Sequence, residues 1–144
     1  MLLYRPKYYG GIYLLLGWDI NFPPHTPVIH GDVNCQLRMR PAPMTLFAFR
    51  THAHKHGTVI TGYLYRENKF IEVARGDPQE PQMFYPMETE VVVDNGDFLV
   101  ARCTFNTTQE NQPIYIGIAN KFLDKVMFLI HLALGTKLVP YLHF

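Results

Sequence analysis

Residues that favour turns recur at short intervals along this chain, and the segments between them are rich in β-branched and aromatic residues. Among the 144 residues are 10 glycines, 11 prolines, 9 tyrosines and 10 phenylalanines, a composition that excludes a coiled coil and a collagen-like repeat. The pattern predicts an all-β protein for most of its length. We expect strands at residues 12–19, 34–40, 46–54, 59–66, 69–74, 90–93 and 98–106.

Two connections have the chemistry of tight turns. Glu67-Asn68 and the run Asp94–Asp97 separate apolar segments with residues that tolerate positive φ, so both predict antiparallel hairpins. In the last expected strand, every second residue from Leu99 to Phe105 is apolar, which predicts one buried face. An antiparallel β-sandwich with one buried side per sheet fits this alternation.

Two segments depart from the strand pattern. Residues 75–88 contain prolines 78, 81 and 86, and we expect an ordered loop there, because proline cannot donate to a sheet ladder. Beyond Gln112, apolar residues recur at helical spacing between a possible cap at Asn120 and Gly135, which predicts a C-terminal helix. These residues are Phe122, Val126, Leu129, Ile130, Ala133 and Leu134.

Size and charge narrow the function classes. A chain of this length forms one domain with a real core. The formal charge of +1, with basic residues scattered among acidic ones, makes nucleic acid an unexpected partner, and no apolar run is long enough to span a membrane. The N-terminus lacks a secretory signal pattern. Cys35 and Cys103 form no zinc or redox motif; they could bond each other, or each could have lost a partner.

The densest polar constellation is Arg50–Gly57, at the end of an expected strand. Residues i and i+2 of a strand point to the same face, with their Cα atoms about 6.5 to 7 Å apart. His52 and His54 therefore form a possible half-site for copper, zinc or iron, and His56 could add a third nitrogen. A solvated strand end is the alternative interpretation of the same spacing.

A family resemblance favours the metal interpretation. The segments 47–54, 61–63, 77–88 and 96–105, with further matches upstream at 9–14 and 32–36, resemble the C-terminal domain of the peptidylglycine α-hydroxylating monooxygenases over roughly residues 5–117. They occur in that family's order and at similar spacing. The resemblance implies a jelly-roll-like sandwich in a copper- and ascorbate-dependent enzyme of the secretory pathway. Such an enzyme uses molecular oxygen to hydroxylate the terminal glycine of a peptide, the first step of C-terminal amidation.

The resemblance also assigns roles to residues. His52 and His54 match two ligands of the copper that binds oxygen, and Arg50 matches the arginine that binds the substrate's terminal carboxylate. The third ligand in the family is a methionine of a Met-Cys pair, for which Met127 is the nearest candidate here, although methionine in an apolar pattern commonly serves packing. Cys35 and Cys103 match family cysteines whose disulfide partners lie further downstream.

Several family features are missing from this sequence. The N-terminal domain with the electron-supplying copper has no counterpart before residue 5, and the Met-Cys pair and both cysteine partners are absent. We therefore expect an incomplete sandwich over residues 1–118 and a divergent helical tail over residues 119–144, with little activity in the isolated chain. A non-catalytic β-sandwich module for interaction or metal binding and an amine-hydroxylating relative are the alternatives.

Overall fold

The computed structural model describes residues 10–17, 20–40, 42–116 and 128–135. These residues form ten strands and no helix. The strands are β1 Gly10–Gly17, β2 Ile20–Phe22, β3 Ile29–Gln36, β4 Met44–Ala53, β5 Gly57–Arg66, β6 Lys69–Gly76, β7 Tyr85–Val93, β8 Phe98–Phe105, β9 Ile114–Ile116 and β10 Phe128–Gly135.

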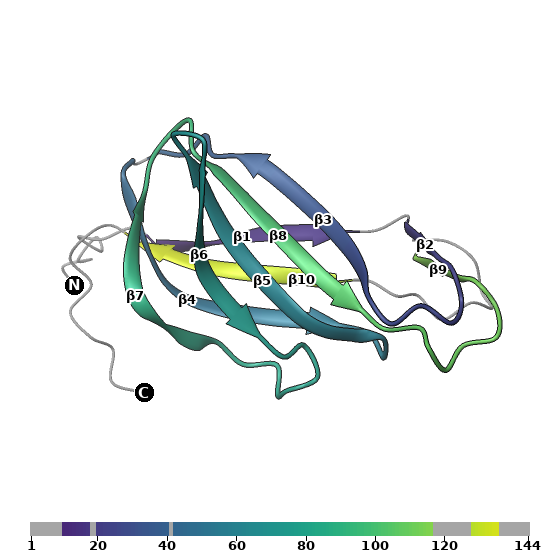
Figure 1. The fold of residues 1–144 in the computed structure, drawn as a ribbon. Coiled ribbons are helices and arrows are strands. Elements are labelled where there is room, and N and C mark those ends of the chain that lie inside the picture. The colour runs from purple at the N-terminus through teal and green to yellow at the C-terminus, as the bar shows by residue number, and fades with distance from the viewer. Residues whose placement is uncertain (1–9, 18–19, 41, 117–127, 136–144) are drawn as a thin grey trace.

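Eight of these strands form two four-stranded antiparallel sheets (Figure 1). The β4 sheet has the order β1-β10-β4-β7, and the β5 sheet has the order β3-β8-β5-β6. The short strands β2 and β9 pair with each other beside them. The expected antiparallel β-sandwich is therefore confirmed.

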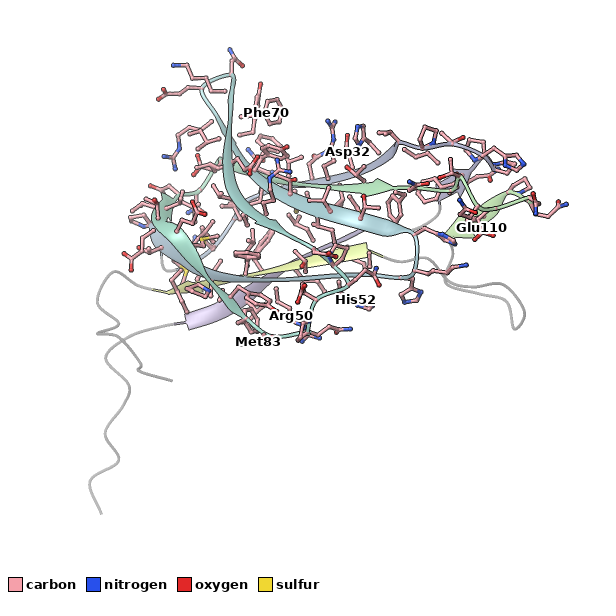
Figure 2. All side chains as sticks on the ribbon, turned by 60° about the horizontal axis from the view of Figure 1, so that its bottom comes forward. Asp32, Arg50, His52, Phe70, Met83 and Glu110 are labelled. Carbon is pink, nitrogen blue, oxygen red and sulfur yellow. The ribbon has the colours of Figure 1, made fainter. Side chains whose placement is uncertain are left out.

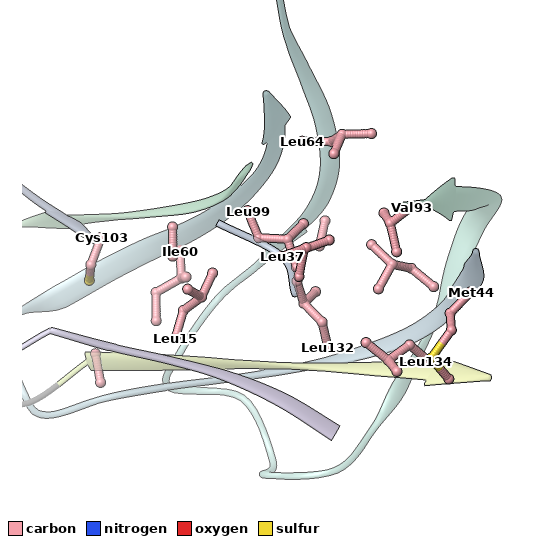
Figure 3. Close-up of a cluster of buried hydrophobic side chains, with 14 of the residues drawn as sticks. Leu15, Leu37, Met44, Ile60, Leu64, Val93, Leu99, Cys103, Leu132 and Leu134 are labelled. Atoms are coloured by element: carbon pink, nitrogen blue, oxygen red, sulfur yellow. The ribbon is translucent and has the colours of Figure 1, made fainter. Parts of the chain in front are cut away.

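The core lies between the two sheets. Leu15 and Leu132 from the β4 sheet meet Ile60 and Leu99 from the β5 sheet, and all four are at most 2% exposed (Figure 3). The predicted buried face of β8 is confirmed, because each second residue from Leu99 to Phe105 is fully buried. This alternation leaves the other face of each sheet free to carry polar groups.

The predicted C-terminal helix is wrong where the structure describes it. Residues Phe128–Gly135 form β10, which lies between β1 and β4 and pairs with both. Residues 120–127, including Met127, lie outside the described ranges. The sequence of β10 is apolar at almost every position, and such a run fits a helix and a buried strand equally well. Ladder partners on both sides decide in favour of the strand.

The two predicted hairpin turns have different outcomes. The β5–β6 hairpin is confirmed: Glu67 and Asn68 have φ values of 52° and 60°, which suit a two-residue turn of the type that matches strand twist. The Asp94–Asp97 turn joins β7 to β8, which lie in different sheets, so the predicted hairpin there is wrong. Residues that tolerate positive φ reverse the chain without deciding which sheet receives the next strand.

The proline-containing segment is irregular over a shorter stretch than predicted. Strand β6 continues to Gly76 and β7 begins at Tyr85, so the β6–β7 loop is residues 77–84. Pro86 lies in β7 opposite Ala48 of β4, and β7 is an edge strand, where proline is tolerated. Among the described residues, no helix is long and apolar enough to cross a membrane.

Candidate metal centre

Strand β4 and the residue directly after it present three polar side chains on the outer face of the sheet. Thr51 and Ala53 point into the core and are 4% and 3% exposed. Because side chains alternate along a strand, Arg50 and His52 point the other way and are partly exposed, and His54 continues this face directly after the strand ends. Figure 2 shows Arg50 and His52 close to the β6–β7 loop, with Met83 nearby.

The two predicted imidazole ligands lie beside each other. The ring centroids of His52 and His54 are 5.3 Å apart, and their planes meet edge to face at 70°. The rings are therefore not splayed to opposite sides of the strand. This is the arrangement that the i, i+2 spacing predicts, although their role as metal ligands stays a prediction.

The chain turns sharply after His54, so the side chain of His56 does not lie beside those of His52 and His54 as a third ligand. The N–H of Gly57 donates to the carbonyl of His54 at 2.9 Å, and a Cβ at position 57 would come within 2.4 Å of the Ala53 side chain. His56 instead lies 3.5 Å from a carboxylate oxygen of Glu110, which also binds Lys55. Within the described ranges, no three His, Cys, Asp or Glu side chains form a metal-sized group.

The β6–β7 loop is fastened to the end of β4 by Gln79. Its side-chain amide lies 3.1 to 3.2 Å from the carbonyl oxygens of Ala53, His54 and Gly57. Within the loop, the Tyr85 hydroxyl donates to the carbonyl of Pro81 at 2.9 Å. These bonds hold the loop against the segment that carries both histidines.

A second glutamine of this loop connects the other two site residues. The Gln82 carboxamide has its nitrogen 2.8 Å from Nδ1 of His52, and its oxygen accepts a hydrogen bond from Nη2 of Arg50. Neither Gln79 nor Gln82 was predicted as a site residue from the sequence. The available signal was the Gln-x-Pro-Gln run within the segment 77–88 that carried the family resemblance.

The Arg50 guanidinium makes fewer hydrogen bonds than a partly buried, charged group needs to offset its loss of hydration. Its Nε atom is buried and has no hydrogen-bond partner among the described residues. Its Nη2 atom donates to the oxygen of the neutral Gln82 amide. A buried donor without an acceptor costs free energy in the free protein, and a ligand that accepts from Arg50 Nε would remove this cost.

The remaining predicted site residues lie elsewhere. Met127 is outside the described residues, and the structure therefore does not place the expected third ligand. Met83, beside Gln82, is 56% exposed. Cys35 and Cys103 are both free: Cys35 is exposed, whereas burial raises the pKa of the Cys103 thiol and makes it unreactive.

Comparison with known proteins gives a consistent result. The family described as copper type II ascorbate-dependent monooxygenase, C-terminal domain, matches residues 8–131. A peptidylglycine alpha-amidating monooxygenase of Rattus norvegicus is 40% identical over 108 residues, and form A of the Xenopus laevis enzyme is 37% identical over 108 residues. Each alignment covers 75% of this chain and 11% of the relative.

A dopamine beta-hydroxylase of Canis lupus familiaris is more distant. It is 30% identical over 89 residues, which cover 60% of this chain and 14% of that relative. The chain thus spans about a tenth of the length of the amidating relatives it matches.

Proposed function

This chain belongs to the copper type II, ascorbate-dependent monooxygenase family as a C-terminal domain, and we propose that it contributes the substrate-side copper site of a peptidylglycine monooxygenase. His52 and His54 hold the copper, and Arg50 holds the terminal carboxylate of a glycine-extended peptide. The observation that carries this proposal is the juxtaposition of two neighbouring imidazoles and an under-compensated guanidinium on one face of β4.

The donor set fits copper. Neutral imidazole nitrogens suit both Cu(I) and Cu(II), and the two rings are close enough to share one ion. A thioether as third ligand would favour Cu(I), and the proposal keeps Met127 in that place. When bound, copper supplies the redox chemistry toward oxygen, with ascorbate as the reductant.

Arg50 is suited to hold the substrate. A planar guanidinium binds a carboxylate through two parallel hydrogen bonds, which fix the carboxylate's orientation as well as its position. Arg50 and His52 are two residues apart on the same face of β4. A carboxylate at Arg50 therefore places the adjacent glycine Cα beside the copper-binding histidines, and this positioning is the contribution of the chain to the reaction.

The complete reaction needs more than this site. The resemblance assigns the electron-supplying copper to an N-terminal domain, which the proposal treats as a partner in the secretory pathway. The proposal retains a boundary near residue 118 between the family domain and a divergent tail. Residues 128–135 of that tail form a strand of the sandwich and not a helix. We expect the 144-residue chain alone to bind copper and to hydroxylate slowly or not at all.

Copper titration tests the metal site. We expect the double variant His52→Ala/His54→Ala to lose about a hundredfold or more in copper affinity, because both nitrogen ligands are removed. His30→Ala is the matched control, since His30 is an exposed histidine of β3 in the other sheet. Equal copper affinity in the double variant and the wild type would show that this strand is not the site.

Substrate competition separates the peptide function from the amine-hydroxylating alternative, which the match to dopamine beta-hydroxylase favours. With copper bound, we expect N-acetylglycine to bind more tightly than a phenylethylamine without a carboxylate. Equal binding of the two compounds would favour the amine alternative. Full turnover of a glycine-extended peptide by the chain alone, with ascorbate and oxygen, would contradict the need for a partner domain.

A further inference from the structure

We propose that the side-chain amide of Gln82 couples metal binding at His52 to carboxylate binding at Arg50. Gln82 lies between the two groups and bonds to each of them. The inference deepens the proposed function and rests on it. In this role Gln82 is a positioning residue, because it acts through His52 and Arg50 and not on the reacting atoms.

The hydrogen-bonding capacity of the three side chains fixes their orientation. A guanidinium can only donate, so the amide group facing Arg50 must be the carbonyl oxygen of Gln82. The NH2 group of Gln82 must then face Nδ1 of His52, at 2.8 Å. Nδ1 accepts this bond, and a neutral His52 therefore carries its proton on Nε2.

Metal binding through Nε2 conflicts with this arrangement. The metal needs the Nε2 lone pair, so the neutral ring must lose its Nε2 proton to solvent and take one from solvent at Nδ1. The protonated Nδ1 would then face the NH2 group of Gln82, and two donors would oppose each other. Rotating the amide by about 180° removes the conflict, because its oxygen then accepts from Nδ1–H, as metal-bound histidines require.

The rotation changes the environment of Arg50. It turns the NH2 group of Gln82 toward Nη2, so the bond that Arg50 now makes to the amide oxygen is lost. The buried Nε of Arg50 already has no acceptor among the residues that the structure describes. A guanidinium in this state binds an external carboxylate more tightly. Metal at His52 therefore raises carboxylate affinity at Arg50, and the linkage is reciprocal.

The alternative is coordination through Nδ1. The metal would then displace the amide hydrogen bond from His52 and leave the bond between Gln82 and Arg50 intact. In that case metal and carboxylate would bind without coupling through Gln82. The two arrangements therefore make opposite predictions for the same measurement.

The test is calorimetric titration of the 144-residue chain with N-acetylglycine, with and without Cu(II). We expect copper to tighten N-acetylglycine binding about tenfold in the wild type, roughly the value of one charge-assisted hydrogen bond. Gln82→Ala should reduce this effect to about twofold or less. Glu80→Ala is the matched control in the same loop, since Glu80 is exposed and takes no part in the bridge, and it should behave as the wild type.

Gln82→Glu gives the opposite test. A carboxylate at position 82 can accept hydrogen bonds from both Arg50 and Nδ1–H of His52. We therefore expect the Gln82→Glu variant to bind copper more tightly than the wild type does, and to bind N-acetylglycine weakly whether or not copper is present. Nitrogen NMR of the metal-free chain gives a readout that a merely structural role would not change. His52 should carry its proton on Nε2 in the wild type and on Nδ1 in Gln82→Glu.

Two failures remain distinguishable. If the wild type binds no copper, or if the two histidine substitutions leave copper binding unchanged, the proposed function fails and this inference fails with it. If copper binds at the histidines but Gln82→Ala keeps the wild-type coupling, only the inference is overturned, because the coupling then comes from direct contact between carboxylate and metal. An Nδ1–H tautomer of neutral His52 in the metal-free wild type would also overturn it.

Discussion

Two arginines of this sandwich lie in contrasting surroundings. Arg66, at the end of β5, donates its Nε to a carboxylate oxygen of Asp97 at 2.8 Å and its Nη2 to both Asp97 and the carbonyl of Val92. Arg50, on β4, bonds to the neutral amide of Gln82 and leaves its buried Nε without a partner within the described ranges. The charge of Arg66 is therefore neutralised by a carboxylate of the same chain, whereas Arg50 has no such partner among the described residues.

Two further arginines are paired with carboxylates in the same way as Arg66. Arg75 and Arg102 each make two hydrogen bonds of 2.8 Å to one carboxylate, from Glu72 and Asp32 respectively. Among these four arginines, Arg50 alone faces no carboxylate in the described structure. Arg50 therefore differs from these three arginines in having no carboxylate partner, which agrees with the role proposed for it in binding a ligand carboxylate.

The largest effect should come from the compensated arginine's partner. Asp97 is 7% exposed, and its carboxylate also accepts from the N–H of Asp94 at 2.8 Å. We expect Asp97→Ala to lower the free energy of unfolding by about 3 kcal/mol, because the variant leaves Arg66 and the β7–β8 turn without their acceptor. Urea denaturation measures this loss.

Asp32→Ala is the control for that measurement. It breaks a bidentate pair of similar geometry, but both partners are more than 40% exposed, so we expect a loss of about 0 to 1 kcal/mol. If the two variants lost the same stability, the contrast between buried and exposed compensation would not hold.

Acid should reduce the contribution of the Asp97–Arg66 ion pair to the free energy of unfolding. The Arg66 guanidinium holds the pKa of Asp97 below its ordinary value of 3.8. A carboxyl with a lowered folded-state pKa stabilises the fold above the unfolded value, and this stability disappears as the pH falls from about 3.8 through the folded pKa. The loss is about 1.4 kcal/mol for each unit by which the two pKa values differ.

Asp97→Asn isolates this contribution. The difference in unfolding free energy between the wild type and the variant should shrink as the pH falls below about 4. The pKa values of Asp32 and Glu72 are also lowered by their arginines, but both groups remain in both proteins and cancel. A difference that stays constant from neutral pH to pH 2 would contradict the assignment.

The β5–β6 hairpin and the buried face of β8 could be predicted because their determinants are local. Glu67 and Asn68 supply the two positive φ angles of the turn, and the alternation from Leu99 to Phe105 defines a face without reference to any partner. Strand β10 could not be predicted in this way. Its apolar residues fit two periodicities, and the choice depends on the unpaired edges of β1 and β4, more than seventy residues away in the chain.

The candidate site also combines features that local sequence determines with features that depend on distant segments. The spacing of His52 and His54 is local, so their neighbouring rings follow from a strand with side chains alternating between its faces. The bridge through Gln82 depends on the β6–β7 loop folding back over β4, thirty residues away from His52. The hairpin predicted at Asp94–Asp97 was wrong for a related reason, because the turn residues do not determine which sheet receives β8.

The uncompensated arginine should matter for ligand binding. With copper bound, we expect Arg50→Ala to weaken N-acetylglycine binding about tenfold, equivalent to about 1.4 kcal/mol, because the carboxylate loses its guanidinium partner. Arg75→Ala, which removes an exposed arginine of the other sheet, should leave binding unchanged. Unchanged binding in the Arg50 variant would mean that the carboxylate binds elsewhere and that Arg50 is not the ligand-binding arginine.

The smallest effect should be on the stability of the Arg50 variant itself. Arg50→Met keeps an apolar stem over β4 while removing the buried Nε that lacks an acceptor among the described residues. Replacing an unsatisfied buried donor by an apolar group is close to neutral, so we expect the unfolding free energy to change by less than about 0.5 kcal/mol in either direction. A loss of several kcal/mol in urea denaturation would mean that Arg50 is a structural residue like Arg66, and that its charge is already compensated in the free protein.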